Sequence, residues 1–574
     1  MSFRPPAADQ RFLLDHVVRM AELQGHNAFA EATPDTVDAI LEGVAAFAAA
    51  EFAPLNRVGD TVGARWADGR VTMPAGFHEA YRAYVEAGWG TLGAAPEHGG
   101  QGLPFTLSTV VLEDLGGANM AFSLCPMLTA GAVEALQKHG SFELQRTYLP
   151  KIVSGEWPAT MNLTEPQAGS DVGALKTRAT PRGDGSYLIQ GVKIYITFGE
   201  HDLSDNIVHL VLARLPDAPA GTRGISLFLV PKVRVRSDGT LGEPNDVHCV
   251  SIEHKMGIHA SPTCVMSYGD NGDCVGHIVG AEGEGMRAMF TMMNNARLNV
   301  GLQGVSIAER ATQGAAHYAS ERTQGSREGK PAAINQHPDV RRVLLRMKAL
   351  TMGARSLLYY AAGQIDRGHL GDAEARARAD LLTPLAKAWG TDVGVEVAGL
   401  GIQVHGGMGY VEETGAAQHL RDARIAPIYE GTNGIQAADL VGRKLGLGGG
   451  AVLAALIGDM RAEATDAGLR ELINACEEVA EWMKAAPMDD RLAGSYPFLT
   501  MLSVAVAGWL MERQRGVAQG MAARSEGDGM FVEMKIASAD QFLATIVPEA
   551  IGLMQSALVG SATLYALPTE AFAA

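Results

Sequence analysis

Cysteine is scarce in this chain, and its few positions indicate no covalent or metal-bound framework. Five cysteines are scattered widely along the sequence, at Cys125, Cys249, Cys264, Cys274 and Cys476. No CxxC pair or Cys/His cluster has the spacing of metal ligands. A disulfide scaffold and a structural metal site are therefore not expected, and a reducing, cytoplasmic compartment fits best.

Positive charge is also in short supply. The chain has 47 lysines and arginines against 64 acidic residues, which gives a formal net charge of −17 at pH 7. Non-specific binding to nucleic acid requires a basic surface. We therefore expect no nucleic-acid partner.

Long uninterrupted apolar runs are missing too, although apolar residues make up 47% of the chain. No window reaches the length needed to cross a bilayer. The N-terminal segment MSFRPPAADQRFLLDHVVRM lacks a charged region followed by an apolar run, so we expect no signal peptide and no stable membrane insertion. At 574 residues the chain is too long for a single core, and several domains are expected.

The spacing of apolar residues changes along the chain and predicts a multidomain α+β protein. Helical spacing over residues 1–158 predicts an N-terminal all-α domain, and alternating spacing over 159–283 predicts a small antiparallel β-barrel. Helical spacing returns over 284–446, as in a four-helix bundle. Residues 447–574 predict an extra C-terminal helical domain.

Within the bundle region, four helices are expected. Their predicted extents are Met286 to about Glu321, Asp339 to Arg367, a third from Thr383-Pro384 to about Gly406-Gly407, and roughly Ile435 to Lys444. Thr383 and Pro384 resemble an N-cap followed by proline at the first helical position. The C-terminal region predicts three further helices, around 452–485, 496–523 and 531–557.

The stretch IYEGTNGIQ, residues 428–436, has the composition of a general-base site. Glu430 stands between the apolar pair Ile428-Tyr429 and a turn that begins at Gly431. Burial beside apolar groups raises the pKa of a carboxyl group, which suits a base that must remove a weakly acidic carbon-bound proton. Taken alone, the stretch also fits a surface glutamate before a loop, so its function depends on the remaining motifs.

Two more motifs precede this stretch. Residues 161–172 read MNLTEPQAGSDV, and residues 193–197 read KIYIT. Together with YEGT, in this order, they resemble the acyl-CoA dehydrogenase family over roughly residues 35–446. The N-terminal pattern RPPxxDxRFLL, the segment FGEHDLSDNIVH and the C-terminal extension resemble a longer bacterial subgroup of that family.

The resemblance implies an FAD-dependent oxidoreductase of fatty acid β-oxidation. Its members convert an acyl-CoA thioester to the trans-2-enoyl-CoA, and flavin N5 accepts the hydride. Here Glu430 would remove the α-proton. The implied substrate is a short- to medium-chain fatty acyl-CoA or 3-methylmercaptopropionyl-CoA. An electron-transfer flavoprotein would accept the electrons, and the enzyme would be a homodimer or a higher homo-oligomer.

The same resemblance implies cofactor contacts in two groups. In the β-domain, Thr164 and Thr197 would donate to the isoalloxazine edge, Tyr195 would pack on the ring, and Ser170 beside Gly169 would contact the pyrophosphate. Taken alone, Tyr195 and Thr197 also fit an ordinary strand. The implied cofactor contacts are Met161, Leu163, Thr164, Gly169, Ser170, Tyr195, Thr197, Arg322, Gln403, His405, Gly406, Gly407, Thr432 and Asn433.

Some of these contacts would come from a partner subunit. Arg322 resembles the arginine that reaches a neighbouring subunit's FAD diphosphate, a task that suits the fixed donors of a guanidinium group. In this chain Gln324-Gly325 replaces the Thr-Phe that follows in the family. Gln403, His405 and the Gly406-Gly407 turn match the segment that approaches the adenine half of the cofactor.

On the substrate side, the resemblance implies contacts from Arg297, Asn294, Ser170, Tyr429 and Gly431. Some relatives carry their base one residue before the arginine. Here that residue is Ala296, which cannot remove a proton, so the base assignment falls on Glu430. Two alternatives stay open: an oxygen-using acyl-CoA oxidase, and a non-catalytic helical scaffold protein.

Overall fold

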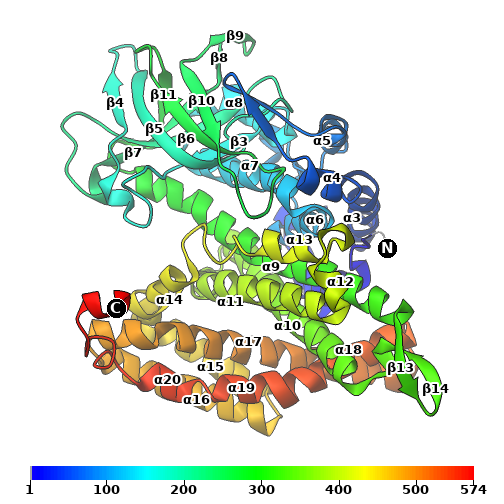
Figure 1. The fold of residues 1–574 in the computed structure, drawn as a ribbon. Coiled ribbons are helices and arrows are strands. Elements are labelled where there is room, and N and C mark those ends of the chain that lie inside the picture. Colours follow the sequence, from blue (N-terminus) through cyan, green and yellow to red (C-terminus); the bar gives the residue numbers. More distant parts are fainter. Residues whose placement is uncertain (1–2) are drawn as a thin grey trace. The chain divides into compact units, whose positions relative to one another are not determined.

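The computed structural model describes residues 3–574, which form two compact units (Figure 1). The first, called the β unit, contains Glu31–Ala296 and the short segment that ends at Pro5. The second, called the helical unit, contains Pro6–Ala30 and Arg297–Ala574. The long helix α9 (Gly285–Glu321) passes from one unit to the other between Ala296 and Arg297. The division into four domains stays a prediction.

Helices build the N-terminal part of the β unit, as the apolar spacing predicted. Thr33 caps the first of them, because its Oγ1 accepts a hydrogen bond of 3.2 Å from the N–H of Thr36 and Pro34 follows at the first helical position. The helices are α3 (Pro34–Phe47), α4 (Leu55–Thr61), α5 (Phe77–Glu86), α6 (Phe105–Ala118), α7 (Met120–His139) and α8 (Phe142–Ser154). A short hairpin, β1 (Arg65–Ala67) and β2 (Arg70–Thr72), lies between α4 and α5.

The rest of the β unit contains an eight-stranded sheet. Its strands are β3 (Ala159–Asn162), β4 (Arg178–Pro181), β5 (Tyr187–Thr197), β6 (Val208–Arg214), β7 (Ile225–Pro231), β10 (Val247–Ile252), β11 (Thr263–Tyr268) and β12 (Val275–Val279). Most pairs are antiparallel, as expected, but β3 and β4 each pair with β6 in parallel, so the sheet is mixed. Strands β8 (Val233–Val235) and β9 (Leu241–Pro244) form a separate hairpin. Ile189, Val211 and Phe228 lie in the buried core of the eight-stranded sheet.

The helical unit begins with α1 (Ala7–Leu13) and α2 (Met20–Gln24) and continues with the bundle helices. These are the C-terminal part of α9, then α10 (Pro338–His369), α11 (Ala373–His405), α12 (Gly407–Tyr410), α13 (Ala416–Ala423) and α14 (Asn433–Gly442). A hairpin of β13 (Thr323–Arg327) and β14 (Lys330–Ala333) extends beyond the end of α9 (Figure 1). The sequence patterns did not predict this hairpin.

The predicted start of the third bundle helix was wrong. Helix α11 begins at Ala373, where Asp372 Oδ1 accepts a hydrogen bond of 2.9 Å from the N–H of Ala375. Thr383 lies inside the helix, and its Oγ1 donates a hydrogen bond of 2.8 Å to the carbonyl of Ala379. Pro384 therefore occupies an interior position, where it removes one helical hydrogen bond without ending the helix.

Glycines allow α9 and α11 to approach until their backbones touch. A Cβ placed on Gly304 would lie 2.0 Å from the carbonyl oxygen of Gly390, and one on Gly301 would lie 2.5 Å from that of Ala386. A Cβ on Gly394 would meet Gly304 at 2.7 Å. No other residue type fits at Gly304 without separating the two helices. This contact fixes the side chains of α9 relative to those of α11.

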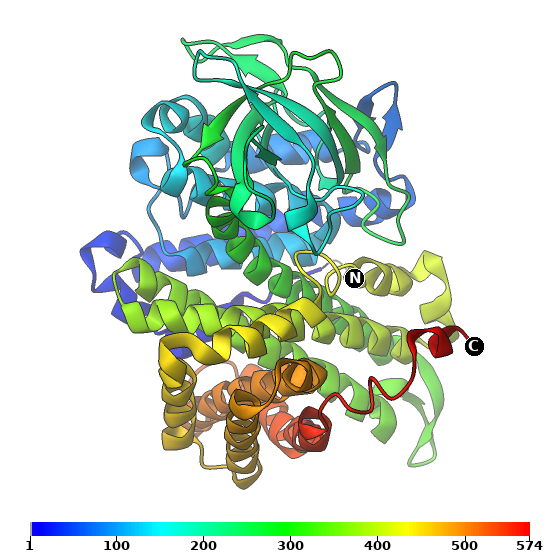
Figure 2. The same ribbon diagram turned by 90° about the vertical axis from the view of Figure 1, so that its left-hand side faces the viewer.

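The C-terminal region forms a separate set of helices, which we call the extension. They are α15 (Ala451–Glu463), α16 (Ala467–Ala485), α17 (Met488–Arg524), α18 (Gly529–Gln541), α19 (Val547–Ile551) and α20 (Met554–Leu558). Figure 2 shows these orange and red helices packed along the green and yellow helices of the bundle. The predicted helix 452–485 is divided at residues 464–466, where Glu512 accepts backbone hydrogen bonds from Thr465 and Asp466.

Two segments of the helical unit are long and apolar enough to cross a membrane by composition: α17, and the stretch Asn433–Glu463. In α17, 83% of the apolar window is buried inside the protein, which is typical of a core helix. The corresponding share for Asn433–Glu463 is 39%. The absence of stable membrane insertion stays a prediction.

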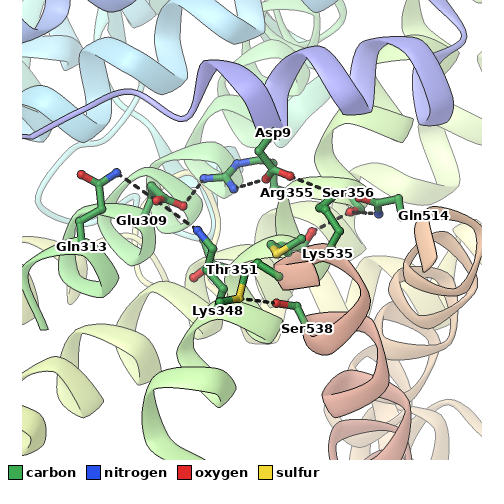
Figure 3. A network of polar contacts seen from close by, with 12 residues as sticks. Asp9, Glu309, Gln313, Lys348, Thr351, Arg355, Ser356, Gln514, Lys535 and Ser538 are labelled. Carbon is green, nitrogen blue, oxygen red and sulfur yellow. Dashed lines mark hydrogen bonds and ion pairs between the residues drawn. The ribbon is translucent and has the colours of Figure 1, made fainter. Parts of the chain in front are cut away.

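A buried ionic network joins the N-terminal helix, the bundle and the extension (Figure 3). Asp9 of α1 accepts hydrogen bonds of 2.6 Å from Arg355 of α10 and from Lys535 of α18. Arg355 also pairs with Glu309 of α9 at 2.8 Å. Lys535 continues to Gln514 of α17 at 2.5 Å. Because each charge has a partner of opposite sign, the network can exist away from water and holds five helices in one arrangement.

Candidate active site

Glu430 lies on a tight turn between α13 and α14 in the helical unit. Thr432 caps α14, because its Oγ1 accepts a hydrogen bond of 3.2 Å from the N–H of Ile435. Two successive residues have positive φ, 54° at Glu430 and 82° at Gly431. Glycine adopts this conformation freely, whereas a glutamate there is strained and persists only where its surroundings hold it.

Polar side chains from three helices hold this turn. Lys387 of α11, which is fully buried, donates to the carbonyl of Gly431 and to Oδ1 of Asn433, both at 2.9 Å. Gln436 of α14 donates at 3.3 Å to the carbonyls of Glu430 and Gly431. The Tyr429 hydroxyl hydrogen-bonds Gln303 of α9. The backbone of the turn is thus fixed from both sides of the Glu430 side chain.

The environment of Glu430 gives its carboxyl group the protonation behaviour of a general base. Burial raises the pKa of Glu430 to about 7, although the positive charges of Arg297 and Lys387 oppose this shift. Burial also lowers the pKa of Lys387 to about 7. A carboxyl group with this pKa is partly ionised at neutral pH and binds a proton more strongly than an ordinary glutamate.

Arg297 approaches the same turn from α9. Its side chain is buried, and Nη2 lies 3.8 Å from the position that a Cβ on Gly431 would occupy. Ala296, which precedes Arg297, is buried and carries no acidic group. Asn294, one helical turn before Arg297, is exposed. The structure therefore brings Arg297, Tyr429 and Gly431 together around Glu430, and their contact with a substrate stays a prediction.

In the β unit, the two remaining motifs lie side by side. The N–H of Ile194 in β5 donates a hydrogen bond of 2.9 Å to the carbonyl of Thr164, two residues beyond the end of β3. Buried Lys193 donates to the carbonyl of Leu163 at 3.0 Å and to Glu165 at 2.8 Å. Burial alone would raise the pKa of Glu165, but the Lys193 ammonium group outweighs this effect and lowers the pKa to about 2. An ion pair thus fixes one motif against the other.

The surface around these two motifs of the β unit is open to a flat aromatic cofactor. Tyr195 lies within β5, has a φ of 60° and has 59% of its surface exposed. Thr164 and Thr197 are half-buried beside it, and Met161 and Leu163 share that intermediate exposure. Gly169 and Ser170 lie on an exposed loop, and a Cβ on Gly169 would meet only open space. An exposed ring beside hydroxyl donors and an open glycine loop fits an isoalloxazine with an attached pyrophosphate.

The remaining implied cofactor residues gather near the C-terminal end of α9. Arg322 is exposed just after the helix, and Tyr318, one turn earlier, stacks on the His405 ring at 4.5 Å between centroids. Gln403, Gly406 and Gly407 are exposed near the end of α11. Arg297 lies 25 residues before Arg322 in the chain, within α9, which at 1.5 Å per residue places it about 37 Å away along the helix. A cofactor whose flavin lies beside Glu430 and Arg297 could not also extend to Arg322 of the same chain.

Two implied cofactor contacts, Thr432 and Asn433, use their side chains in hydrogen bonds to the protein itself. Asn433 is buried, and its amide bonds Lys387, the Ala388 carbonyl and Asp392. The hydroxyl of Thr432 caps α14. For Asn433, a cofactor contact would fall to the backbone.

Sequence reasoning missed several residues that shape the site, above all Lys387, Gln303 and the Glu165–Lys193 pair. Lys387 is a lone cation within the apolar run LLTPLAKAW, and such a residue is rarely buried without a partner. That pattern could have marked it. Gln303 sits on a long helix among other polar residues, and no local pattern singles it out.

Family models match almost the whole chain. The acyl-CoA dehydrogenase N-terminal domain matches residues 34–156, the middle domain 160–270 and the C-terminal domain 283–445. The model described as acetyl-CoA dehydrogenase C-terminal like matches residues 451–568, within the extension.

Curated relatives match over nearly their full lengths. The 3-methylmercaptopropionyl-CoA dehydrogenase of Ruegeria pomeroyi is 45% identical over 96% of this chain and 97% of its own. A butyryl-CoA dehydrogenase of Syntrophomonas wolfei is 36% identical over 94% of each chain. A broad-specificity linear acyl-CoA dehydrogenase of Mycobacterium tuberculosis is 33% identical over 95% of this chain and 96% of its own.

Solved structures share the fold. An acyl-CoA dehydrogenase complexed with FAD from Bacillus anthracis has a TM-score of 0.74 at 21% identity and covers 99% of this chain and 93% of its own. Caenorhabditis elegans ACDH-11 in complex with C11-CoA has a TM-score of 0.75 at 20% identity over 94% of this chain and 92% of its own.

The fold and the two sets of site residues have the arrangement expected of a flavin-dependent oxidoreductase. The matches to family models and to full-length relatives are more specific: the chain belongs to the acyl-CoA dehydrogenase family. It is an enzyme of the acyl-CoA dehydrogenase type, and its cofactor is FAD.

Proposed function

We propose that the enzyme removes hydrogen from the α and β carbons of an acyl-CoA thioester and releases the trans-2-enoyl-CoA, with Glu430 as the base. One observation carries this proposal. The Glu430 carboxyl group has a pKa raised to about 7 and lies on a strained turn that Lys387 and Gln436 hold in place. A strained, half-buried carboxylate with this pKa suits abstraction of a carbon-bound proton.

In the proposed reaction, Glu430 accepts the α-proton of the thioester on its carboxylate. The backbone N–H of Glu430 donates a hydrogen bond to the thioester carbonyl, where negative charge develops as the proton leaves. Arg297 adds a positive charge near the same turn. The buried surroundings strengthen these interactions, because little water competes with them.

The β unit would hold the cofactor, with Thr164 and Thr197 donating to the flavin edge, Tyr195 against the ring and Ser170 at the pyrophosphate. FAD, when bound, accepts the β-hydrogen together with its electron pair. The Glu165–Lys193 ion pair keeps Thr164 beside β5, so that the donors from both motifs face one ligand.

We also propose that two copies of the chain complete the cofactor site. Arg322 follows the C-terminal end of α9, about 37 Å along the helix from Arg297, and His405 at the end of α11 stacks on Tyr318 near the same end. A flavin beside Glu430 and Arg297 would leave these residues, and Gln403 next to His405, beyond the reach of the same cofactor molecule. They would serve the FAD of a second copy, in a homodimer or a higher homo-oligomer. Arg322 is fully available for this role, because the whole segment from Glu321 to Lys330 is exposed.

For the substrate, we propose a short- to medium-chain acyl-CoA, with 3-methylmercaptopropionyl-CoA and butyryl-CoA as the two leading candidates. The names and identities of the full-length relatives support this range. We further propose that the enzyme is cytoplasmic and acts in fatty acid β-oxidation. It would pass its electrons to an electron-transfer flavoprotein, because this acceptor is common in the family.

A substrate panel tests the proposed function. The purified, FAD-loaded protein is mixed with acyl-CoA esters from C4 to C16 and with 3-methylmercaptopropionyl-CoA, in the presence of a dye acceptor. We expect dye reduction with short chains and formation of the 2-enoyl-CoA. Absence of turnover with every ester would contradict the proposal. Peroxide formation with acyl-CoA and no added acceptor would instead identify an oxygen-using oxidase.

A further inference from the structure

A hydrogen-bond chain connects the extension to the turn that carries Glu430. Tyr496, in α17 of the extension, donates a hydrogen bond of 2.6 Å to Oδ2 of Asp392 in α11. The other carboxylate oxygen of Asp392 accepts a hydrogen bond of 2.8 Å from the side-chain amide of Asn433. Asn433 is the first residue of α14, three residues after Glu430. Helices α11, α14 and α17 lie next to one another in Figure 1.

The chain continues from Asn433 to the catalytic turn itself. Oδ1 of Asn433 accepts a hydrogen bond of 2.9 Å from Lys387, and Lys387 also donates to the carbonyl of Gly431. The amide of Asn433 further donates to the carbonyl of Ala388 at 3.0 Å. Asn433 is buried, so these protein groups replace water as its partners. A side chain of the extension is therefore linked to Gly431 through three intervening residues.

The Tyr496 hydroxyl affects how well Asp392 can act in this chain. Burial raises the pKa of Asp392, and the hydrogen bonds from Tyr496 and Asn433 and the charge of Lys387 oppose that rise. Loss of the tyrosine hydroxyl removes a donor to the ionised carboxylate. Asp392 then becomes a poorer acceptor for Asn433 and a weaker counter-charge for Lys387, because linked hydrogen bonds strengthen one another.

We propose that Tyr496 is a positioning residue for catalysis, through which the extension holds Glu430 in its strained conformation. This inference rests on the proposed function of Glu430 as the base. The positive φ of Glu430 requires support from its surroundings, and Tyr496 is the outermost member of the chain that supplies it. Small displacements of a catalytic group reduce the rate strongly, so the hydroxyl affects turnover without contacting the substrate.

The test compares Tyr496→Phe with Tyr565→Phe in the full-length, FAD-loaded protein. Tyr565 is a matched control, because it also lies in the C-terminal region and is 71% exposed. Steady-state rates are measured with butyryl-CoA and a dye acceptor, and amide hydrogen exchange is followed by mass spectrometry in the peptide that spans residues 428–436.

For Tyr496→Phe we expect kcat to fall by about 3- to 10-fold with KM nearly unchanged, and the 428–436 peptide to exchange faster. Tyr565→Phe should leave both quantities at the wild-type values. A second comparison uses Asp392→Asn. If Tyr496 acts through Asp392, adding Tyr496→Phe to Asp392→Asn lowers kcat no further.

Wild-type kcat and wild-type exchange in Tyr496→Phe would overturn the inference, as would faster exchange with unchanged kcat. Additive losses in the double variant would also overturn it. Failure of the proposed function would be seen in the wild type and not in the Tyr496 variants. If the wild type turns over no acyl-CoA ester, Glu430 is not the base of this reaction, and the exchange of the 428–436 peptide alone decides whether Tyr496 holds the turn.

Discussion

At the scale of single residues, the protonation state of Glu430 controls the proposed chemistry. Its pKa is raised to about 7, and only the ionised carboxylate can accept the α-proton. We therefore predict that kcat/KM rises with pH, about tenfold per pH unit below 7, and becomes constant above 7 to 8. Steady-state rates from pH 5 to 9, with a substrate that does not titrate in this range, measure the profile. A constant rate from pH 5 to 7 would contradict the raised pKa.

Individual residues differ in how far the sequence could predict them. The sequence singles out Glu430, because YEGT follows two other motifs in the order of the family, and its function as the base stays a prediction. The roles of Lys387 and Tyr496 depend on partners that are distant in sequence, at Gly431 and Asp392. Such pairs follow from the tertiary structure, and no local pattern reveals them. Asn433 belongs to the motif, but only the structure shows that its side chain points inward.

At the scale of helices, the contact between α9 and α11 sets the geometry around Glu430. Helix α9 carries Arg297 and Gln303, and α11 carries Lys387, so the separation of the two helices fixes how these side chains meet the turn. Glycines at Gly301, Gly304, Gly390 and Gly394 set that separation.

We predict that Gly304→Ala lowers the free energy of unfolding by about 3 kcal/mol or more, because the new Cβ would lie 2.0 Å from a backbone oxygen that cannot move alone. Gly314→Ala is the matched control on the same helix. A Cβ at Gly314 meets nothing within 4 Å, so this change should be neutral or stabilise by up to about 1 kcal/mol. Urea unfolding measures both variants, and equal stability of the two would contradict the close contact.

The sequence predicted the positions of most helices better than their ends. Helix α8 (Phe142–Ser154) lies within the region 1–158 that was expected to be helical, and its ends follow local signals, because Ser141 caps one end and Gly155 adopts a positive φ at the other. The start of α11 was wrong, because Pro384 lies inside a helix that tertiary packing stabilises despite the lost hydrogen bond. The predicted helix 452–485 is divided, because Glu512, distant in sequence, accepts the backbone hydrogen bonds at the break.

At the scale of the whole molecule, the buried ionic network fastens the N-terminal helix α1 and helix α18 of the extension to the bundle. Asp9 stands between Arg355 and Lys535, and Arg355 also pairs with Glu309. Burial alone would raise the pKa values of Asp9 and Glu309, but the surrounding cations lower both, that of Glu309 to about 2. Because these folded-state values lie below the unfolded ones, the network stabilises the protein above about pH 4 to 5 and loses this effect as the pH falls towards 2.

We predict that Asp9→Asn lowers the free energy of unfolding by about 3 to 5 kcal/mol at pH 7, because it leaves two buried cations without their shared carboxylate. Asp15→Asn is the control, since Asp15 forms an exposed pair with Arg11 in the same N-terminal segment and should cost under about 1 kcal/mol. The difference between Asp9→Asn and the wild type should shrink as the pH is lowered from 7 to 3. Urea unfolding at several pH values measures it, and a pH-independent difference would contradict the lowered pKa of Asp9.

The general architecture was predictable, because the apolar spacing changes between helical and alternating patterns along the chain. The parallel pairing of β3 and β4 with β6 was not, because strand order depends on contacts between distant segments. The grouping of Pro6–Ala30 with the helical unit also depends on such a contact, between Asp9 and two residues more than 300 positions away.

The central claim is that Glu430 removes the α-proton, and Glu430→Gln tests it most directly. Glutamine keeps the shape of the side chain but cannot accept the proton. The FAD-loaded variant is mixed, without oxygen, with the acyl-CoA ester that the wild type uses best, and the flavin absorbance is followed. We predict that FAD stays bound and that its absorbance decays at least about 1,000-fold more slowly than in the wild type. Decay at the wild-type rate would show that Glu430 is not the base.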